Sequence, residues 1–177
     1  MILWGLFLFL MTLQYSFGGV IDPQEDICRS LTSCSTCVVK SYCSWCITKN
    51  RCTKQSCRND NVIYPEFSTA LMSGPTFCPR VEVDPTEDKI LKSGKREVIT
   101  LKITQIHLHM AFTPWKCRIV VGGKEQVVSA AIVAGTVYCD AVVLNNESGD
   151  PSVAGEVSVM WDYNKRLDGA VPIKIYS

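Results

Sequence analysis

The chain has 177 residues, of which 47% are hydrophobic and 20% are charged, and its formal net charge is +1. This length and hydrophobic content allow one large or two small domains, and they exclude a disordered tail. Duplex nucleic acid requires a basic face, so we expect no nucleic-acid partner. The sequence has ten cysteines but only two histidines. Two histidines are too few for most hydrolase and metal sites that depend on imidazole side chains.

The first residues predict a secretory signal peptide at residues 1–18. A compact apolar run extends from Ile2 to Leu13, which is shorter than the roughly 20 residues of a membrane-spanning helix. Ser16 and Gly18 then supply small side chains at the spacing that signal peptidase accepts, so we expect cleavage after Gly18. Because no Lys or Arg precedes the run, a short signal anchor is the alternative.

The rest of the sequence contains no second apolar run of spanning length. We therefore expect a secreted, extracellular mature chain that carries no membrane span. That compartment is oxidising, and paired cysteines there form disulfides by default.

Residues 27–79 predict a small cysteine-rich module. The segment has few apolar runs, so it cannot bury enough area to fold on the hydrophobic effect and must rely on cross-links. In the loop-entropy model, closing a loop of about 15 residues contributes on the order of 3 kcal/mol. The cysteines of this module are Cys28, Cys34, Cys37, Cys43, Cys46, Cys52, Cys57 and Cys78.

Residues 80–177 predict an all-β domain, because apolar and polar side chains alternate and turn sequences recur at intervals of roughly ten residues. The turns are Gly122-Gly123, the polar run 145–151 and Asp168-Gly169. About seven strands in this length are typical of a two-sheet immunoglobulin-like sandwich. The sets expected to face its core are Ile99, Leu101 and Ile103; Val137, Cys139, Ala141 and Val143; Val157, Val159 and Trp161; and Val171, Ile173 and Ile175.

The strand pattern changes face near Thr104-Gln105. Ile99, Leu101 and Ile103 are odd-numbered, whereas the next apolar residues, Ile106, Leu108 and Met110, are even-numbered. This switch predicts a bulge or break, after which the even positions face the core. His107 and His109 then point outward together. Two histidines at this spacing can bind a metal, but no third ligand is identifiable, so a solvated pair is the favoured interpretation.

The spacing of the first eight cysteines, C-x5-C-x2-C-x5-C-x-W-C-x5-C-x4-C with a last cysteine about twenty residues on, resembles the plexin-semaphorin-integrin (PSI) cysteine-rich module. Cys43-Ser44-Trp45-Cys46 matches the Cys-x-Trp-Cys core of that family, with Ser where the family often has Gly. Sequence alone allows 105 pairings of eight cysteines. The resemblance implies the disulfides Cys28–Cys43, Cys34–Cys78, Cys37–Cys52 and Cys46–Cys57.

The second half is similar to the immunoglobulin-like IPT/TIG domain that follows this module in plexins. The matching segments are 115–119, 137–139 and 156–161, although Cys117 and Cys139 lie closer together than an immunoglobulin pair and enclose no Trp. The resemblance implies a Cys117–Cys139 disulfide and a domain layout of residues 27–79 and 80–177. It also implies a non-enzymatic role in semaphorin–plexin recognition, with semaphorin or plexin ectodomains as partners.

Plexins carry a ligand-binding propeller, further repeats, a membrane span and a cytoplasmic region, and none of these is visible in the sequence. We therefore expect either a short secreted plexin-like protein or an incomplete product of a larger gene. The remaining alternatives are an adhesion or matrix protein and a redox or metal protein.

Four cysteines, Cys34, Cys37, Cys43 and Cys46, also form two closely spaced pairs that could bind zinc. The two pairs are too close together for usual four-cysteine sites, and four cysteines would be left over. Disulfides are therefore favoured over zinc and over a redox-active Cys-x-x-Cys motif. We expect no cofactor and no catalytic residues, because the sequence has no Gly-x-Ser-x-Gly motif and no phosphate-binding loop.

Three further features are candidate sites. Trp45 is expected to fill the small core of the cysteine-rich module, with a binding role as the lesser alternative. Asn146-Glu147-Ser148 is an N-glycosylation sequon in a polar turn, so we expect a glycan at Asn146. A basic patch of the module could bind a glycosaminoglycan, although a solvated surface is favoured. Its residues are Lys40, Lys49, Arg51, Lys54 and Arg58.

Overall fold

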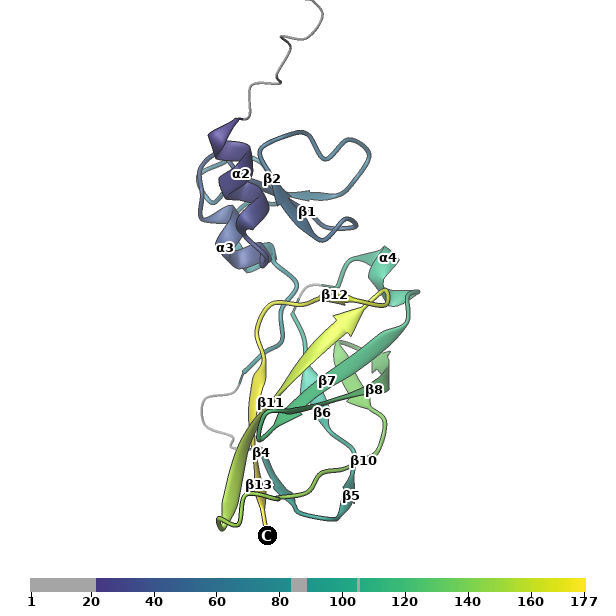
Figure 1. Cartoon of the computed structure of the whole chain (residues 1–177). Coiled ribbons are helices and arrows are strands. Elements are labelled where there is room, and N and C mark those ends of the chain that lie inside the picture. The colour runs from purple at the N-terminus through teal and green to yellow at the C-terminus, as the bar shows by residue number, and fades with distance from the viewer. Residues whose placement is uncertain (1–21, 84–88, 105) are drawn as a thin grey trace, which may run out of the picture.

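The computed structural model describes residues 22–83, 89–104 and 106–177. The predicted signal peptide lies outside these residues. The described chain forms a small cysteine-rich module and a longer β-sandwich, stacked end to end (Figure 1). The fold class expected from the sequence, a disulfide-rich module followed by an immunoglobulin-like sandwich, is confirmed.

The cysteine-rich module packs short helices against a small antiparallel sheet. Helix α2 begins at Pro23, ahead of the expected module boundary, because the Asp22 carboxylate accepts a hydrogen bond from Gln24 N and Pro is favoured in a first turn. Ser33 caps α3 in the same way by accepting from Thr36 N. The elements are α2 (Pro23–Ser30), α3 (Cys34–Val38), β1 (Ser44–Cys46), β2 (Arg51–Thr53), β3 (Val62–Ile63) and the 3₁₀ helix η2 (Pro75–Phe77), with sheet order β2-β1-β3.

The sandwich is built from one large curled sheet and one small sheet. The large sheet runs in the order β4-β13-β11-β7-β8-β9-β6 with β12 paired to β11, and β10 pairs with β5 in the small sheet. Lys89 Nζ on edge strand β4 donates to Thr100 O on the opposite edge strand, β6, so the sheet curls far enough to bring its two edges together. The strands are β4 (Lys89–Lys92), β5 (Arg96–Glu97), β6 (Thr100–Lys102), β7 (Trp115–Val121), β8 (Lys124–Val133), β9 (Thr136–Cys139), β10 (Val142–Val143), β11 (Ser152–Trp161), β12 (Lys165–Arg166) and β13 (Val171–Tyr176), and a single short helix, α4 (Leu108–Ala111), lies among the described residues of this half.

Most of the predicted core-facing sets are buried as expected. The prediction is confirmed for the odd residues of 99–103, 157–161 and 171–175. It is wrong for Val143, which is 46% exposed while Val142 is buried. The β9 strand ends at Cys139, and β10 begins a new pairing with β5, so the inward-facing parity changes between them.

The predicted inward-facing set Ile106, Leu108 and Met110 is also wrong in two of its three members. Leu108 is 79% exposed and Ile106 is 36% exposed, whereas Met110 is 1% exposed. The chain does not continue here as a strand. It forms the one-turn helix α4, and a helical turn of four residues buries one side only.

Candidate functional site: the joint between the modules

The linker that leaves the cysteine-rich module is fastened to both modules. The Cys34–Cys78 bridge ties the end of the module back to the start of α3. Beyond Pro79, which is buried, the chain pairs with the turn after β12: Val81 N donates to Asp168 O at 2.9 Å, and Asp168 N donates to Pro79 O at 3.2 Å. Residues 79–81 are therefore part of the folded structure rather than a free tether.

The side chain of Asp168 crosses from the sandwich to the cysteine-rich module. One carboxylate oxygen accepts a hydrogen bond from Cys34 N at 3.0 Å and the other accepts from Ser35 N at 2.6 Å. These amides open the first turn of α3, where backbone N–H groups lack helical partners and favour negative charge. Asp168 is only 9% exposed. Charge-assisted hydrogen bonds shielded from water in this way are strong and directional.

Apolar side chains from both modules close around this carboxylate. Trp45 and Ile47 of the cysteine-rich module line the same small pocket as Trp161 and Leu167 of the sandwich, and the volume of this pocket is about 10 Å³. That is roughly the room for one water molecule. All four side chains belong to one continuous hydrophobic cluster that spans both modules. Figure 1 shows this joint where α3 approaches the β12 end of the sandwich.

The joint contains a residue that the sequence analysis did not single out. Asp168 was expected only as part of an Asp-Gly turn, and Gly169 does adopt a positive φ of 80° there. Its partner Cys34 lies 134 residues away. A cross-module contact of this kind leaves no local sequence signal. Trp45, by contrast, is 3% exposed and fills the core at the position expected for it.

A second buried carboxylate, Glu25, holds the cysteine-rich module together internally. It accepts hydrogen bonds from the Thr53 hydroxyl and Lys54 N, and it pairs with Arg29 at 2.7 Å. Burial alone would raise the pKa of Glu25, but these hydrogen bonds and one from Gln55 N outweigh it and hold the pKa below its ordinary value. The carboxylate is therefore fully partnered and serves the fold.

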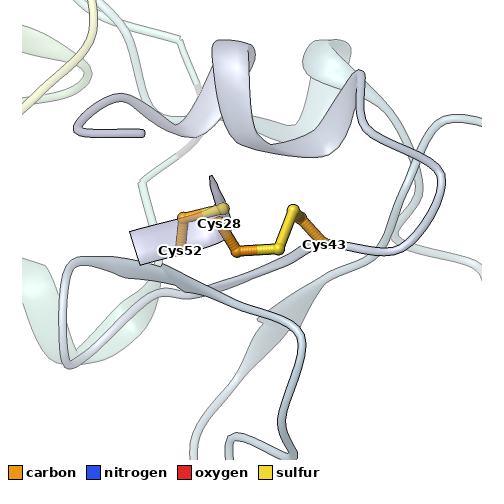
Figure 2. Close-up of side chains that lie close together, drawn as sticks. All are labelled: Cys28, Cys43 and Cys52. Atoms are coloured by element: carbon orange, nitrogen blue, oxygen red, sulfur yellow. A yellow bond between two sulfur atoms is a disulfide. The ribbon is translucent and has the colours of Figure 1, made fainter. Parts of the chain in front are cut away.

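All ten cysteines lie in the described part of the chain, and none of them is free. Figure 2 shows Cys28 bonded to Cys43, with Cys52 of a neighbouring bridge beside them. A cluster of three sulfur atoms would suit a metal, but these belong to two disulfides. The bridges are the same five pairs that the family resemblance implies: Cys28–Cys43, Cys34–Cys78, Cys37–Cys52, Cys46–Cys57 and Cys117–Cys139.

The four cysteines considered for zinc do not form a site together. Cys34, Cys37, Cys43 and Cys46 are each bonded to a different partner outside the proposed set. A disulfide sulfur carries no thiolate charge, which is what zinc binding requires.

His107 and His109 lie against the sandwich rather than pointing freely outward. Their rings stack with centroids 6.2 Å apart, and His109 meets the Trp161 ring edge-on at 5.6 Å. Burial, and after it the charge of His109, holds the pKa of His107 below its ordinary value. Among the described residues, the two imidazoles join no group of three or more metal-ligating side chains. His109 therefore lies beside the joint, against the same Trp161 ring over which the Lys165 ammonium lies, 4.8 Å from the ring centroid.

The basic patch is partly neutralised by its own module. Lys54 pairs with Asp22 at 2.8 Å, which together with a hydrogen bond from Gln24 N lowers the pKa of Asp22. Lys49 donates its ammonium to Cys57 O at 2.9 Å. Lys40, Arg51 and Arg58 are exposed and take part in none of the ion pairs among the described residues.

Comparison with protein families accounts for both modules. Residues 87–176 match the TIG domain found in plexin, and residues 27–70 match the plexin repeat, PSI. The first match covers half of the chain. The chain therefore belongs to the family of TIG domains found in plexin, preceded by a plexin repeat, and the resemblance seen in the sequence is confirmed.

Solved structures agree in fold. Two structures of the full extracellular region of plexin A4, one with domains 1 to 8 and one with domains 1 to 10, each match with a TM-score of 0.64 and 21% sequence identity. The match covers 84% of this chain but only 15% and 13% of those chains. The chain thus spans about one seventh of the plexin ectodomain that it resembles. No curated protein matches the sequence.

The described residues include no helix that is both long enough and apolar enough to span a membrane.

Proposed function

We propose that the chain is an extracellular, non-catalytic plexin-type stalk unit, which enters the secretory pathway through residues 1–18. It holds its two modules at a fixed angle and presents them to other ectodomains of the semaphorin–plexin type. The observation that carries this proposal is the Asp168 carboxylate, which caps α3 of the neighbouring module across the joint that Trp45 and Trp161 line.

Fixed spacing is a function that this geometry can perform. Interfaces between domains of one chain usually permit relative motion unless they are large and apolar. Here a disulfide, two charge-assisted hydrogen bonds and a shared hydrophobic cluster act on the same joint. A stalk built in this way transmits the orientation of whatever is attached to it, and it exposes surfaces of both modules at a constant separation.

Two measurements on the secreted full chain test the two parts of the proposal. Small-angle X-ray scattering should fit one rigid arrangement for the natural protein and a broader distribution for Asp168→Asn, with Asp150→Asn in an exposed turn as the control. Surface-coupled plexin and semaphorin ectodomains should capture the natural protein saturably. A broad distribution for the natural protein would contradict the rigid joint, and capture by none of these ectodomains would contradict the recognition role.

Glycosaminoglycan binding is a second candidate function, favoured by the exposed Lys40, Arg51 and Arg58. Contacts to sulfated chains are screened by salt, so retention on heparin should fall steeply with ionic strength. We expect little retention, because the other two basic residues of the patch are engaged within the module. Strong retention that is lost in the triple variant K40A/R51A/R58A would favour the glycan-binding function over ectodomain recognition.

A further inference from the structure

The loop between β10 and β11 contains an acceptor arranged for modification. Asn146, Glu147 and Ser148 form the only Asn-X-Ser/Thr triplet in the sequence. The backbone of Asn146 is fixed by a hydrogen bond from its N–H to Ser93 Oγ at 2.9 Å. Its side-chain oxygen accepts two bonds from Ser148, from the backbone N at 3.1 Å and from the hydroxyl at 2.6 Å.

We infer that Asn146 carries an N-linked oligosaccharide, attached by a transferase that uses a lipid-linked sugar pyrophosphate as donor. This inference rests on the secretory route proposed above. In the transfer, a bond forms between Asn146 Nδ2 and the anomeric carbon of the first sugar. The bond from that carbon to the pyrophosphate oxygen breaks, and the pyrophosphate leaves with the electron pair. The Nδ2 proton passes to a base on the transferase.

The Ser148 hydroxyl explains why this triplet suits the reaction. A donor bonded to an amide oxygen draws electron density toward that oxygen, which makes the amide N–H more acidic and its proton easier to remove. Ser148 supplies such a donor at 2.6 Å. Asn146 and Ser148 are only two residues apart, so this contact is local and can form before the rest of the sandwich folds.

The Nδ2 group is occupied in the folded chain, and this sets the order of events. It donates to Asp150 O at 2.7 Å and to Ser177 Oγ at 2.9 Å. Transfer replaces one of its two hydrogens, so one of these bonds is lost in the glycosylated protein. Ser177 lies 31 residues after Asn146. The bond to Ser177 therefore forms only when the sandwich folds, and a chain that is modified before folding presents a free Nδ2.

The position of the loop determines what the sugar covers. Asn146 lies between β10 and β11 at the end of the sandwich where the C-terminus is found, away from the cysteine-rich module (Figure 1). An oligosaccharide there leaves the joint and the cysteine-rich module uncovered. It would instead shield the turn that pairs with Ser93 and Ser177.

The test is the mass of the full chain recovered from the medium of animal cells, before and after peptide N-glycosidase. We expect one glycosidase-sensitive increment, with Asn146 converted to Asp by the enzyme and located by peptide mass spectrometry. Asn146→Gln and Ser148→Ala should both remove the increment. Asn145→Gln and Ser148→Thr are matched controls that should keep it, because neither destroys the triplet.

A secreted, fully oxidised chain whose mass does not change with the glycosidase would overturn the inference. If the chain stays in the cell, residues 1–18 are replaced by an established secretion leader and the measurement is repeated. A glycan on that product supports Asn146 as the glycosylation site. It contradicts only the prediction that residues 1–18 direct secretion. An unmodified product, with its disulfides formed, overturns the site itself.

Discussion

The cysteine-rich module and the sandwich are stabilised by different kinds of interaction. The module has helices of 8 and 5 residues and strands of 2 or 3 residues, and it carries four disulfides. The sandwich has strands of up to 10 residues, a large apolar core and one disulfide. Covalent cross-links thus take the place of buried area in the smaller unit, as expected for domains too small to bury a sufficient core.

The difference also explains where the joint is placed. The module lacks enough apolar surface to form a wide interface, so it contributes two buried side chains, Trp45 and Ile47, and the amides of α3. The sandwich supplies the charge, Asp168, and two further apolar side chains, Trp161 and Leu167. Each module thus contributes to the joint the groups that its own fold provides.

The largest effect should come from removing one bridge in each unit. The double variant Cys46→Ser/Cys57→Ser should unfold the cysteine-rich module, because losing a native disulfide from a small secreted domain costs about 2–5 kcal/mol. Cys117→Ser/Cys139→Ser should leave the sandwich folded but less stable by about 3 kcal/mol, since its core remains. Limited proteolysis followed by peptide mapping distinguishes the two. If both modules resist proteolysis equally in both variants, the fold of the cysteine-rich module does not depend on its disulfides.

Trp45 tests whether the module also needs a packed side chain. Trp45→Ala should destabilise the module by about 3–5 kcal/mol, as for other buried Trp or Phe truncations. Phe67→Ala is the matched control, because Phe67 belongs to the same module and is 80% exposed; its effect should lie within about 0.5 kcal/mol. Chemical denaturation with intact disulfides measures both. Similar losses for the two variants would mean that Trp45 is not a core residue.

The joint should respond to a single change of charge. Asp168→Asn keeps the shape of the side chain but presents an NH2 group to one of the two amides, so we expect a loss of about 1.5–3 kcal/mol from this charge-assisted contact. The loss should appear as faster hydrogen exchange at Cys34 and Ser35, with exchange in the centre of β7 and β11 unchanged. Unaltered hydrogen exchange at Cys34 and Ser35 would show that Asp168 does not stabilise the joint.

The sequence predicts the two modules unequally well, and the reason is physical. Alternation along β13 identifies Val171, Ile173 and Ile175 as core residues, because each strand position fixes its own face. The pairing of the cysteines is predicted only through the resemblance to a known family, because the sequence alone leaves 105 pairings of the first eight cysteines open. Local patterns fail where the chain leaves a strand, as at Leu108 in α4 and at Val143 in β10. They also miss Asp168, because its role depends on amides 133 and 134 residues away.

The smallest expected effects are in acid, where the two modules should lose stability in different pH ranges. The cysteine-rich module contains Asp22, Glu25 and Asp60, whose pKa values are held below their ordinary values. For Asp60, burial acts in the raising direction and is outweighed by hydrogen bonds from Thr48, Lys49 and Asn61. A carboxylate whose pKa is lower in the folded state than in the unfolded state stabilises the folded state. This stabilisation is complete above the unfolded-state pKa and is lost as the pH falls through the folded-state pKa. For Glu25 the loss therefore begins below its ordinary value of 4.5.

The sandwich should begin to respond at a higher pH because of His107. Its pKa is lowered from an ordinary value of 6.5 by burial and then by His109, so the folded sandwich favours the neutral ring. The associated stabilisation is complete above about pH 6.5 and declines as the pH falls from there through the folded pKa. Backbone amide NMR signals of Thr53 in β2 and Ile119 in β7, neither of which lines the joint, report the two modules separately during denaturation. His107→Gln should flatten the upper range only and Glu25→Gln the lower range only. If the signals of both modules instead change together over both ranges in the natural protein, the modules unfold as one unit, which contradicts separate pH ranges.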